Sequence, residues 1–208
     1  MDSSASGARF WSMTIRSRRE RERADREKLI VTAARELAEA EGWEAVTTRR
    51  LAERVEYSQP VLYSHFKGKD AIMVAVALEG FAELAGELRA ARTAAPDAAG
   101  ALAGVGRAYI AFAERRPALY DAMFRHQVDL PFATPQVPPA LAAGFQELVE
   151  AVRPHAGDSD PGDLGLLAET YWAALHGLAT LTLGGRLPRE LHERRLALLL
   201  ARFTAGRS

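Results

Sequence analysis

Apolar residues recur along most of this chain at the spacing of a single helix face. In the segment "REKLIVTAARELAEAEG" (26–42), Ile30, Ala34 and Leu37 belong to one stripe, and Gly42 follows as a stop signal. Strand-like alternation of β-branched residues is missing, and no internal repeat of fixed period is visible. The pattern therefore predicts an all-α protein with eight or nine helices.

Two short helices are predicted directly after this first one. Thr48 can cap the helix "TRRLAERV", and Ser58 can cap the helix "QPVLYSHF". Pro60 then falls in the first turn of that helix, where its missing N–H costs little. Only residues 56–58 separate the two helices. Two short helices joined by such a turn and braced by a preceding helix form a helix-turn-helix unit.

The rest of the chain is predicted to be a larger helical domain. Asp70 is expected to cap a long fourth helix that runs to about Arg92. Further helices are expected at roughly 97–116, 117–127, 138–153, 161–185 and 188–205, with "VDLPFATPQVPP" and "PHAGDSDPGD" as loops. The domain prediction is a disordered or helix-extending basic arm at 1–25, the helix-turn-helix domain at 26–70 and the helical domain at 71–208.

Charge and composition narrow the possible functions. The chain has no cysteine, which excludes disulfides, a thiolate nucleophile and cysteine-built metal sites. Its formal net charge is zero, but residues 9–28 hold eight Lys and Arg against four Asp and Glu. This run is either a solvated face or an arm that contacts phosphates. The most apolar stretch, 164–187, carries charged residues and predicts a buried helix instead of a membrane span. We expect a cytoplasmic protein with no membrane partner.

The third predicted helix has an apolar side and a polar side. Leu62 and Phe66 share the side that can pack into the core, whereas Gln59, Pro60 and Tyr63 lie on the other. An exposed Gln at a helix start can pair with adenine in the major groove, and a Tyr hydroxyl can bind a phosphate. Spacing alone leaves a plain helical corner with solvated lysines as the alternative.

A family resemblance favours the DNA-binding interpretation. The segment "EKLIVTAARELAEAEGWEAVTTRRLAERVEYSQPVLYSHFKGKDAIMVAV" resembles the N-terminal domain of TetR-family transcriptional regulators, most specifically in "LYSHFKGKDAI". The resemblance implies a double-stranded DNA operator as the partner. It also implies that Gln59, Pro60, Val61 and Tyr63 face the bases or their sugar-phosphate edges, and that Thr48, His65 and Lys69 bind phosphates. The full set of candidate DNA-contacting residues is Thr48, Arg49, Ser58, Gln59, Pro60, Val61, Tyr63, His65, Lys67 and Lys69. One departure is Glu56, which stands where the family turn usually has glycine, so a left-handed backbone there would be strained.

For residues 71–208 the resemblance implies dimerisation and the binding of a small-molecule inducer. The Trp172–His176–Gly177 pattern is similar to a TetR-like subclass named for those residues. His176 is either a polar anchor in an apolar pocket or a hydrogen-bonded core residue. The candidate ligand-binding residues recur at helical spacing and are otherwise core: Tyr109, Phe112, Tyr120, Phe124, Trp172 and His176. The last two helices are apolar enough to form a four-helix interface in a homodimer.

Enzymatic interpretations lack support in the sequence. "GVGRAY" (104–109) has neither the preceding strand nor the third glycine of a dinucleotide fingerprint, and His192–Glu193 has no second histidine at zincin spacing. We expect no cofactor or metal and no enzymatic activity. The favoured function is a homodimeric repressor released from a palindromic operator by an inducer. The alternatives are a DNA-binding regulator without an inducer and a small-molecule-binding helical protein without a DNA role.

Overall fold

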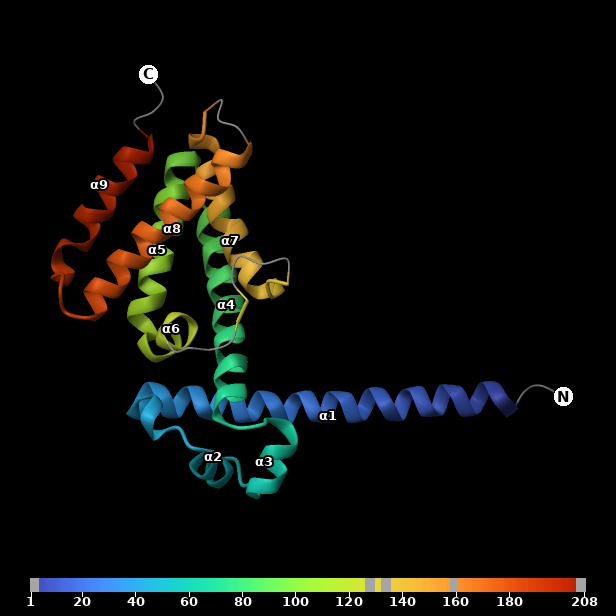
Figure 1. The fold of residues 1–208 in the computed structure, drawn as a ribbon. Coiled ribbons are helices and arrows are strands. Elements are labelled where there is room, and N and C mark those ends of the chain that lie inside the picture. Colours follow the sequence, from blue (N-terminus) through green and yellow to red (C-terminus); the bar gives the residue numbers. More distant parts are fainter. Residues whose placement is uncertain (1–3, 126–129, 132–135, 158–160, 205–208) are drawn as a thin grey trace. The chain divides into compact units, whose positions relative to one another are not determined.

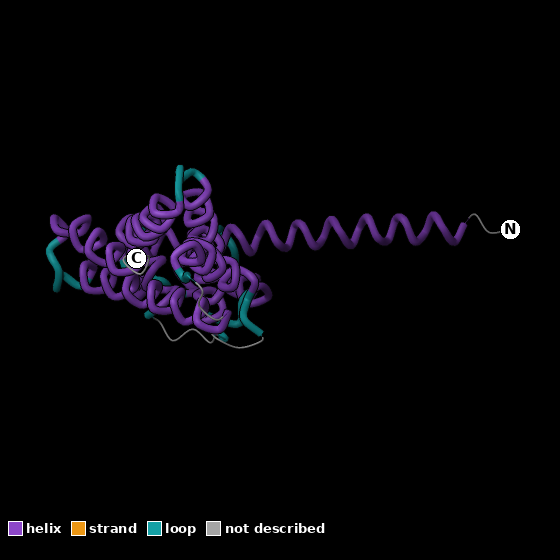
Figure 2. Tube along the Cα trace, turned by 90° about the horizontal axis from the view of Figure 1, so that it is seen from above, coloured by secondary structure: helices purple, strands orange, loops and turns teal. Residues whose placement is uncertain are grey.

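The structure is a computed structural model that describes residues 4–125, 130–131, 136–157 and 161–204 (Figure 1). These residues form helices and short 3-10 turns joined by loops, and no strand occurs among them (Figure 2). The all-α prediction is therefore confirmed for the described part of the chain. The chain divides into two compact units, one up to Val76 and one from Ala77 on.

The first unit is a helix-turn-helix braced by a long helix. Its elements are α1 (Ser4–Glu41), the 3-10 turn η1 (Trp43–Ala45), α2 (Thr48–Arg54), α3 (Gln59–His65) and the first residues of α4 (Lys69–Thr93). The apolar stripe predicted for the first helix faces α2 and α3, and Ile30, Leu51 and Leu62 are fully buried where the three helices meet. Burial of a side chain of this size contributes about 1.5–3 kcal/mol, so these contacts fix how α3 is held.

Two of the predicted helix starts differ from the structure by one residue. Thr47, not Thr48, caps α2, because Thr47 has the extended backbone of a cap and its Oγ1 accepts the Arg50 amide at 3.2 Å. The fourth helix begins at Lys69, so Asp70 lies inside its first turn instead of capping it. A carboxylate there still complements the positive end of the helix dipole. Ser58 holds the N-cap position of α3 as predicted.

The first helix begins far earlier than its apolar pattern indicates. The pattern begins near residue 26, whereas α1 begins at Ser4. Ion pairs one turn apart accompany the helix through this charged region, with Arg18 and Glu22 3.4 Å apart and Arg23 and Glu27 2.8 Å apart. Such pairs stabilise a helix by a few tenths of a kcal/mol each without requiring an apolar face.

The second unit is a bundle of helices. It contains the rest of α4 and α5 (Ala98–Arg115), α6 (Pro117–Phe124), α7 (Pro139–Val152), η2 (Arg153–His155), α8 (Pro161–Leu183), η3 (Arg189–Leu191) and α9 (His192–Thr204). These bounds lie within a few residues of the predicted helices. The predicted helix ends at 126–127 and 205, and parts of both predicted loops, lie outside the described residues. Helix α5 is central, because it packs against α6, α7, α8 and α9.

One buried ion pair cluster ties α7 to α4. Glu147 is 2% exposed, and its two carboxylate oxygens accept hydrogen bonds at 2.8 Å from the Nε atoms of Arg89 and Arg92. The two arginines approach from successive turns of α4, so the carboxylate is neutralised where it is desolvated. Among the described residues, no helix is long and apolar enough to cross a membrane.

Candidate nucleic-acid interface and ligand pocket

The turn between α2 and α3 closes the C-terminus of α2 with two backbone hydrogen bonds. The Tyr57 amide donates to the Ala52 carbonyl at 2.9 Å, and the Glu56 amide donates to the Glu53 carbonyl at 3.3 Å. This pairing is a Schellman motif, which requires a left-handed residue at the position of Glu56. Glu56 has a φ of +57°, as the glycine usual in this turn would. The structure therefore places Glu56 in the left-handed backbone conformation for which strain was expected.

Helix α3 presents a continuous exposed face beside its buried one. Gln59, Pro60, Val61 and Tyr63 are exposed, with Val61 and Tyr63 at 40% and 50%. Leu62, between them, is fully buried and anchors the helix on α1 and α2. Exposed apolar and aromatic side chains gathered at one helix start point to a contact surface, because a folded monomer gains nothing by leaving them in water.

Helix α2 adds polar groups to the same surface. The Thr48 and Tyr63 hydroxyl oxygens lie 3.5 Å apart, so the start of α2 is beside the exposed face of α3. Arg49 is exposed next to Thr48 and pairs with Glu53 of its own helix at 2.9 Å. Surface pairs of this kind contribute little, so the Arg49 guanidinium can exchange this partner for another anion.

The structure places the other predicted contact residues differently. The His65 side chain is only 6% exposed, and its Nδ1 lies 3.4 Å from a Glu27 carboxylate oxygen on α1. The Lys69 ammonium donates to the Trp43 carbonyl at 2.6 Å and ties α4 to η1. Both side chains hold the unit together in this conformation, whereas Ser58 and Lys67 are exposed. Phe66, predicted as core, is half-buried at the end of α3.

A paired contact that the sequence did not indicate fixes α2 against the end of α1. The Arg50 guanidinium donates to both carboxylate oxygens of Glu41, at 2.8 and 2.9 Å. The hydrogen bond from Arg50 lowers the pKa of the Glu41 carboxyl, and the same bond raises the pKa of Arg50. Nine residues separate the two, so helical spacing could not have paired them.

The second unit contains a cavity of about 630 Å³ among α4, α5, α6, α7 and α8. Three of the six predicted ligand-binding residues line it, namely Tyr109, Phe124 and Trp172. Most other lining side chains are apolar: Phe81, Leu84, Leu88, Leu141, Phe145 and Leu148. The polar side chains in the lining, apart from the Tyr109 hydroxyl, are Gln146 and Glu169. A cavity of this size and lining matches the sites that hold small organic molecules.

The remaining predicted ligand residues lie behind the cavity wall. Phe112 is fully buried core, with the Arg116 guanidinium 5.4 Å from its ring centre, and it does not line this cavity. Tyr120 and His176 belong to a hydrogen-bonded chain that starts at the cavity. Trp172 Nε1 donates to the Tyr109 hydroxyl at 3.0 Å, and the Tyr109 and Tyr120 hydroxyls are 3.1 Å apart. The Tyr120 hydroxyl lies 2.7 Å from His176 Nδ1, and His176 Nε2 lies 3.4 Å from Thr180 Oγ1.

Burial favours the neutral form of each titratable side chain in this hydrogen-bonded chain. It raises the pKa of the Tyr109 phenol to about 12 and the pKa of Tyr120 further, while it lowers the pKa of His176 below its ordinary 6.5. Both phenols are therefore neutral donors at pH 7, and a neutral imidazole accepts at Nδ1. All hydrogen bonds of the chain can then run in one direction, from the Trp172 indole to His176.

Family models match both units of the chain. The model "Bacterial regulatory proteins, tetR family" matches residues 30–76, and the model "Tetracyclin repressor-like, C-terminal domain" matches residues 102–203. The chain belongs to the TetR family. The first TetR model spans α2, α3 and the turn between them, and the second spans all six candidate ligand residues.

Individual curated relatives match part of the chain. The chain is 31% identical over 96 residues to the uncharacterised HTH-type transcriptional regulator YobS of Bacillus subtilis, covering 46% of this chain and 50% of that protein. It is 51% identical over 48 residues to the tetracycline repressor protein class C of Escherichia coli, covering 23% and 22%. The chain thus spans half or less of the length of these curated relatives.

A solved structure matches more of the molecule. A protein with unknown function from Rhodococcus sp. RHA1 superimposes with a TM-score of 0.72 and 28% identity over 86% of this chain and 94% of that one. The fold assigned to this TetR-family chain therefore extends through both units.

Proposed function

We propose that this protein is a DNA-binding transcriptional regulator, and that the exposed face of α3 reads its operator. The observation that carries the proposal is the joint exposure of Gln59, Val61 and Tyr63 on a helix whose opposite side is locked into the core. The Gln59 amide at the helix start can pair with an adenine edge in the major groove. The hydroxyls of Thr48 and Tyr63, 3.5 Å apart, can bind one phosphate oxygen together.

Substitutions on the two kinds of contact test this assignment. A pool of random 30-bp duplexes, selected on the wild-type protein, yields the preferred site. Gln59→Ala should relax base preference at one position by about 1–3 kcal/mol, whereas Lys67→Ala should weaken all duplexes alike and reduce the salt dependence. Arg189→Ala on η3 of the second unit is a matched control, because it also removes one exposed positive charge. Unchanged site preference in Gln59→Ala would refute the recognition-helix assignment.

We propose that the regulator is a homodimer formed through α8 and α9. Leu166, Leu181 and Leu198 are 60%, 40% and 63% exposed on these two helices. A Cβ built on Gly177 of α8 would meet no described atom within 4 Å, so the close helix contact that a mid-helix glycine permits is open to a second subunit. Two recognition helices would then enter major grooves about one helical turn apart on a near-palindromic site. If this interface forms, Leu198→Glu should shift the protein from dimer to monomer, and sedimentation velocity measures this shift.

We further propose that a small apolar molecule binds the 630 Å³ cavity and releases the DNA, so that the protein acts as a repressor. The cavity favours this function over a regulator without an inducer. Phe81, Leu84 and Leu88 of α4 line the cavity, and α4 continues into the first unit, so a bound ligand touches the helix that leads to α3. This proposal includes that the chain belongs to the TetR-like subclass named for the Trp172–His176–Gly177 pattern.

Ligand release is tested on the selected duplex. Filling the cavity through Ala173→Trp should abolish the effect of any ligand on DNA affinity while leaving DNA binding itself intact. A small-molecule-binding protein without a DNA role would instead show ligand binding and no duplex selection.

A further inference from the structure

The N-terminal half of α1 extends beyond the helices with which α1 packs, and it is rich in arginine (Figure 1). Residues 18–26 are all exposed and include five arginines. The family model that matches the first unit begins at residue 30, so this segment lies outside what the family match describes. The proposed function gives these arginines no role.

Three of the arginines continue the buried stripe of α1. Arg26, Arg23 and Arg19 precede Ile30 by four, seven and eleven residues, which places all three within about 40° of Ile30 around the helix. Ile30 belongs to the side of α1 that faces α2 and α3. We call Arg19, Arg23 and Arg26 the arginine stripe. It projects toward the same side of α1 as the helix-turn-helix.

A contact at the middle of the stripe shows how near it lies to α3. The Arg23 guanidinium donates to the carbonyl of Ser64, near the end of α3, at 3.4 Å, and to Glu27 at 2.8 Å. Its side chain is still 58% exposed, so further donors remain in water. The arginine stripe therefore begins beside the proposed recognition surface and runs outward from it.

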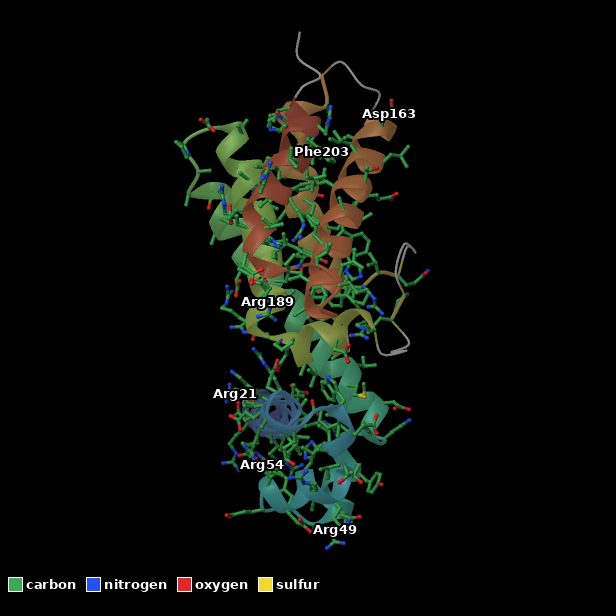
Figure 3. All side chains as sticks on the ribbon, turned by 90° about the vertical axis from the view of Figure 1, so that its left-hand side faces the viewer. Arg21, Arg49, Arg54, Asp163, Arg189 and Phe203 are labelled. Carbon is green, nitrogen blue, oxygen red and sulfur yellow. The ribbon has the colours of Figure 1, made fainter. Side chains whose placement is uncertain are left out.

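The other basic residues of this segment point elsewhere. Arg21 and Lys28 lie about 160–180° around the helix from Ile30, and Arg18 lies about 120° away. In Figure 3, Arg21 lies to the left of α1, whereas Arg49 of α2 lies below α1. Carboxylates alternate with the basic residues, so residues 18–26 hold five arginines against three acidic residues. Glu20, Glu22 and Glu27 lie about 60–80° around the helix from Ile30 and therefore flank the stripe.

We propose that the arginine stripe is a second DNA-contact surface, which binds phosphates of the duplex beside the groove entered by α3. The inference rests on the proposed DNA-binding function. From Arg19 to Arg26 the helix rises about 10 Å, close to the rise of three nucleotides of one strand. The stripe is therefore long enough for three successive phosphate contacts. The α3 contacts select the sequence, and the stripe adds affinity that depends on the length of flanking duplex.

Two triple variants with the same loss of charge test the proposal. R19A/R23A/R26A removes the stripe, and R18A/R21A/K28A removes three positive charges from the other sides of the same helix. Dissociation constants are measured on the selected duplex from 50 to 200 mM salt. Three lost phosphate contacts should lower the slope of log Kd against log salt by about 2.7, so the wild type should lose about 40-fold more affinity over this range than the stripe variant. The control variant should keep a slope within about 1 of the wild type.

Further arms of the experiment separate folding and function from the stripe. R19K/R23K/R26K keeps the charges and should keep the slope, and circular dichroism of all variants checks that α1 is retained. Shortening the duplex to the bases under α3 should bring the wild type to the affinity of the stripe variant. Equal slopes for the two alanine triple variants would overturn the proposed role of the arginine stripe and leave the proposed DNA-binding function intact. Absence of duplex binding by the wild type would overturn the proposed function and the inference with it.

Discussion

Glu56 allows a direct test of how the helix-turn-helix is held. A non-glycine residue with a φ of +57° places its Cβ too close to a carbonyl oxygen, at a cost of about 1–2 kcal/mol. Glycine has no such cost, but it loses more conformational entropy on folding, by roughly 0.5–1 kcal/mol. Glu56→Gly should therefore stabilise the protein by about 0.5–1 kcal/mol.

Glu56→Ala is the matched control, because it removes the same carboxylate and keeps a Cβ at the strained position. Its stability should lie within about 0.5 kcal/mol of the wild type, as for other exposed substitutions. The comparison between glycine and alanine thus isolates the backbone strain from the charge. Both variants remove one negative charge near α3, so DNA affinity should rise alike in the two.

Urea denaturation followed by circular dichroism and tryptophan fluorescence measures the difference, with the m-value as a check on the unfolded state. Amide exchange at Tyr57 gives a local reading, because its N–H closes the turn on the Ala52 carbonyl. Exchange at Tyr57 should slow in Glu56→Gly only. If the glycine variant is no more stable than the alanine variant, the positive φ carries no strain and the reasoning is refuted.

Three further predictions concern the second unit. Arg92→Ala leaves the buried carboxylate of Glu147 with one partner and should cost about 3 kcal/mol in urea denaturation, whereas Arg89→Ala, whose side chain is 69% exposed, should cost about 1 kcal/mol or less. Burial lowers the pKa of His176, so the folded protein binds fewer protons than the unfolded chain below pH 6.5. Stability should then fall as the pH falls through this region, and a flatter profile is expected for His176→Gln. Glu169 is the charged residue of the cavity lining, so calorimetry should show dodecyltrimethylammonium binding tighter than dodecanoate, and Glu169→Gln should weaken the cation about fivefold; tighter binding of dodecanoate would contradict this.

The helices could be predicted from the sequence because their signals are local. Apolar periodicity and the cap residues locate most of the nine helices in the described residues to within a few positions. The start of α1 could not be found in this way, because residues 18–28 alternate in charge and have no apolar stripe. The shift of a cap from Thr48 to Thr47 is of another kind, since two adjacent threonines offer the same chemistry.

The sequence alone could not predict which candidate side chains are exposed in the fold, because exposure depends on tertiary contacts. Gln59 and Tyr63 were placed correctly on the exposed face, since period and polarity determine it. His65 and Lys69 looked equally available in sequence, yet their partners Glu27 and Trp43 are 38 and 26 residues away. Phe112 likewise shares helical spacing with Tyr109, and only the packing around α5 separates a core ring from a cavity ring.

Helix α8 connects the two proposed binding events of the second unit. Glu169, Trp172 and Ala173 form part of the cavity wall, while Leu166 and Leu181 are exposed on a neighbouring face of the same helix. A ligand that shifts α8 must therefore change the surface offered to the second subunit. Coupling of this kind is reciprocal, so dimerisation must alter ligand affinity by the same factor by which the ligand alters dimerisation. The hydrogen bonds from Trp172 through Tyr109 and Tyr120 to His176 join α8 to α5 and α6, so a shift of α8 must either carry these residues with it or break these bonds.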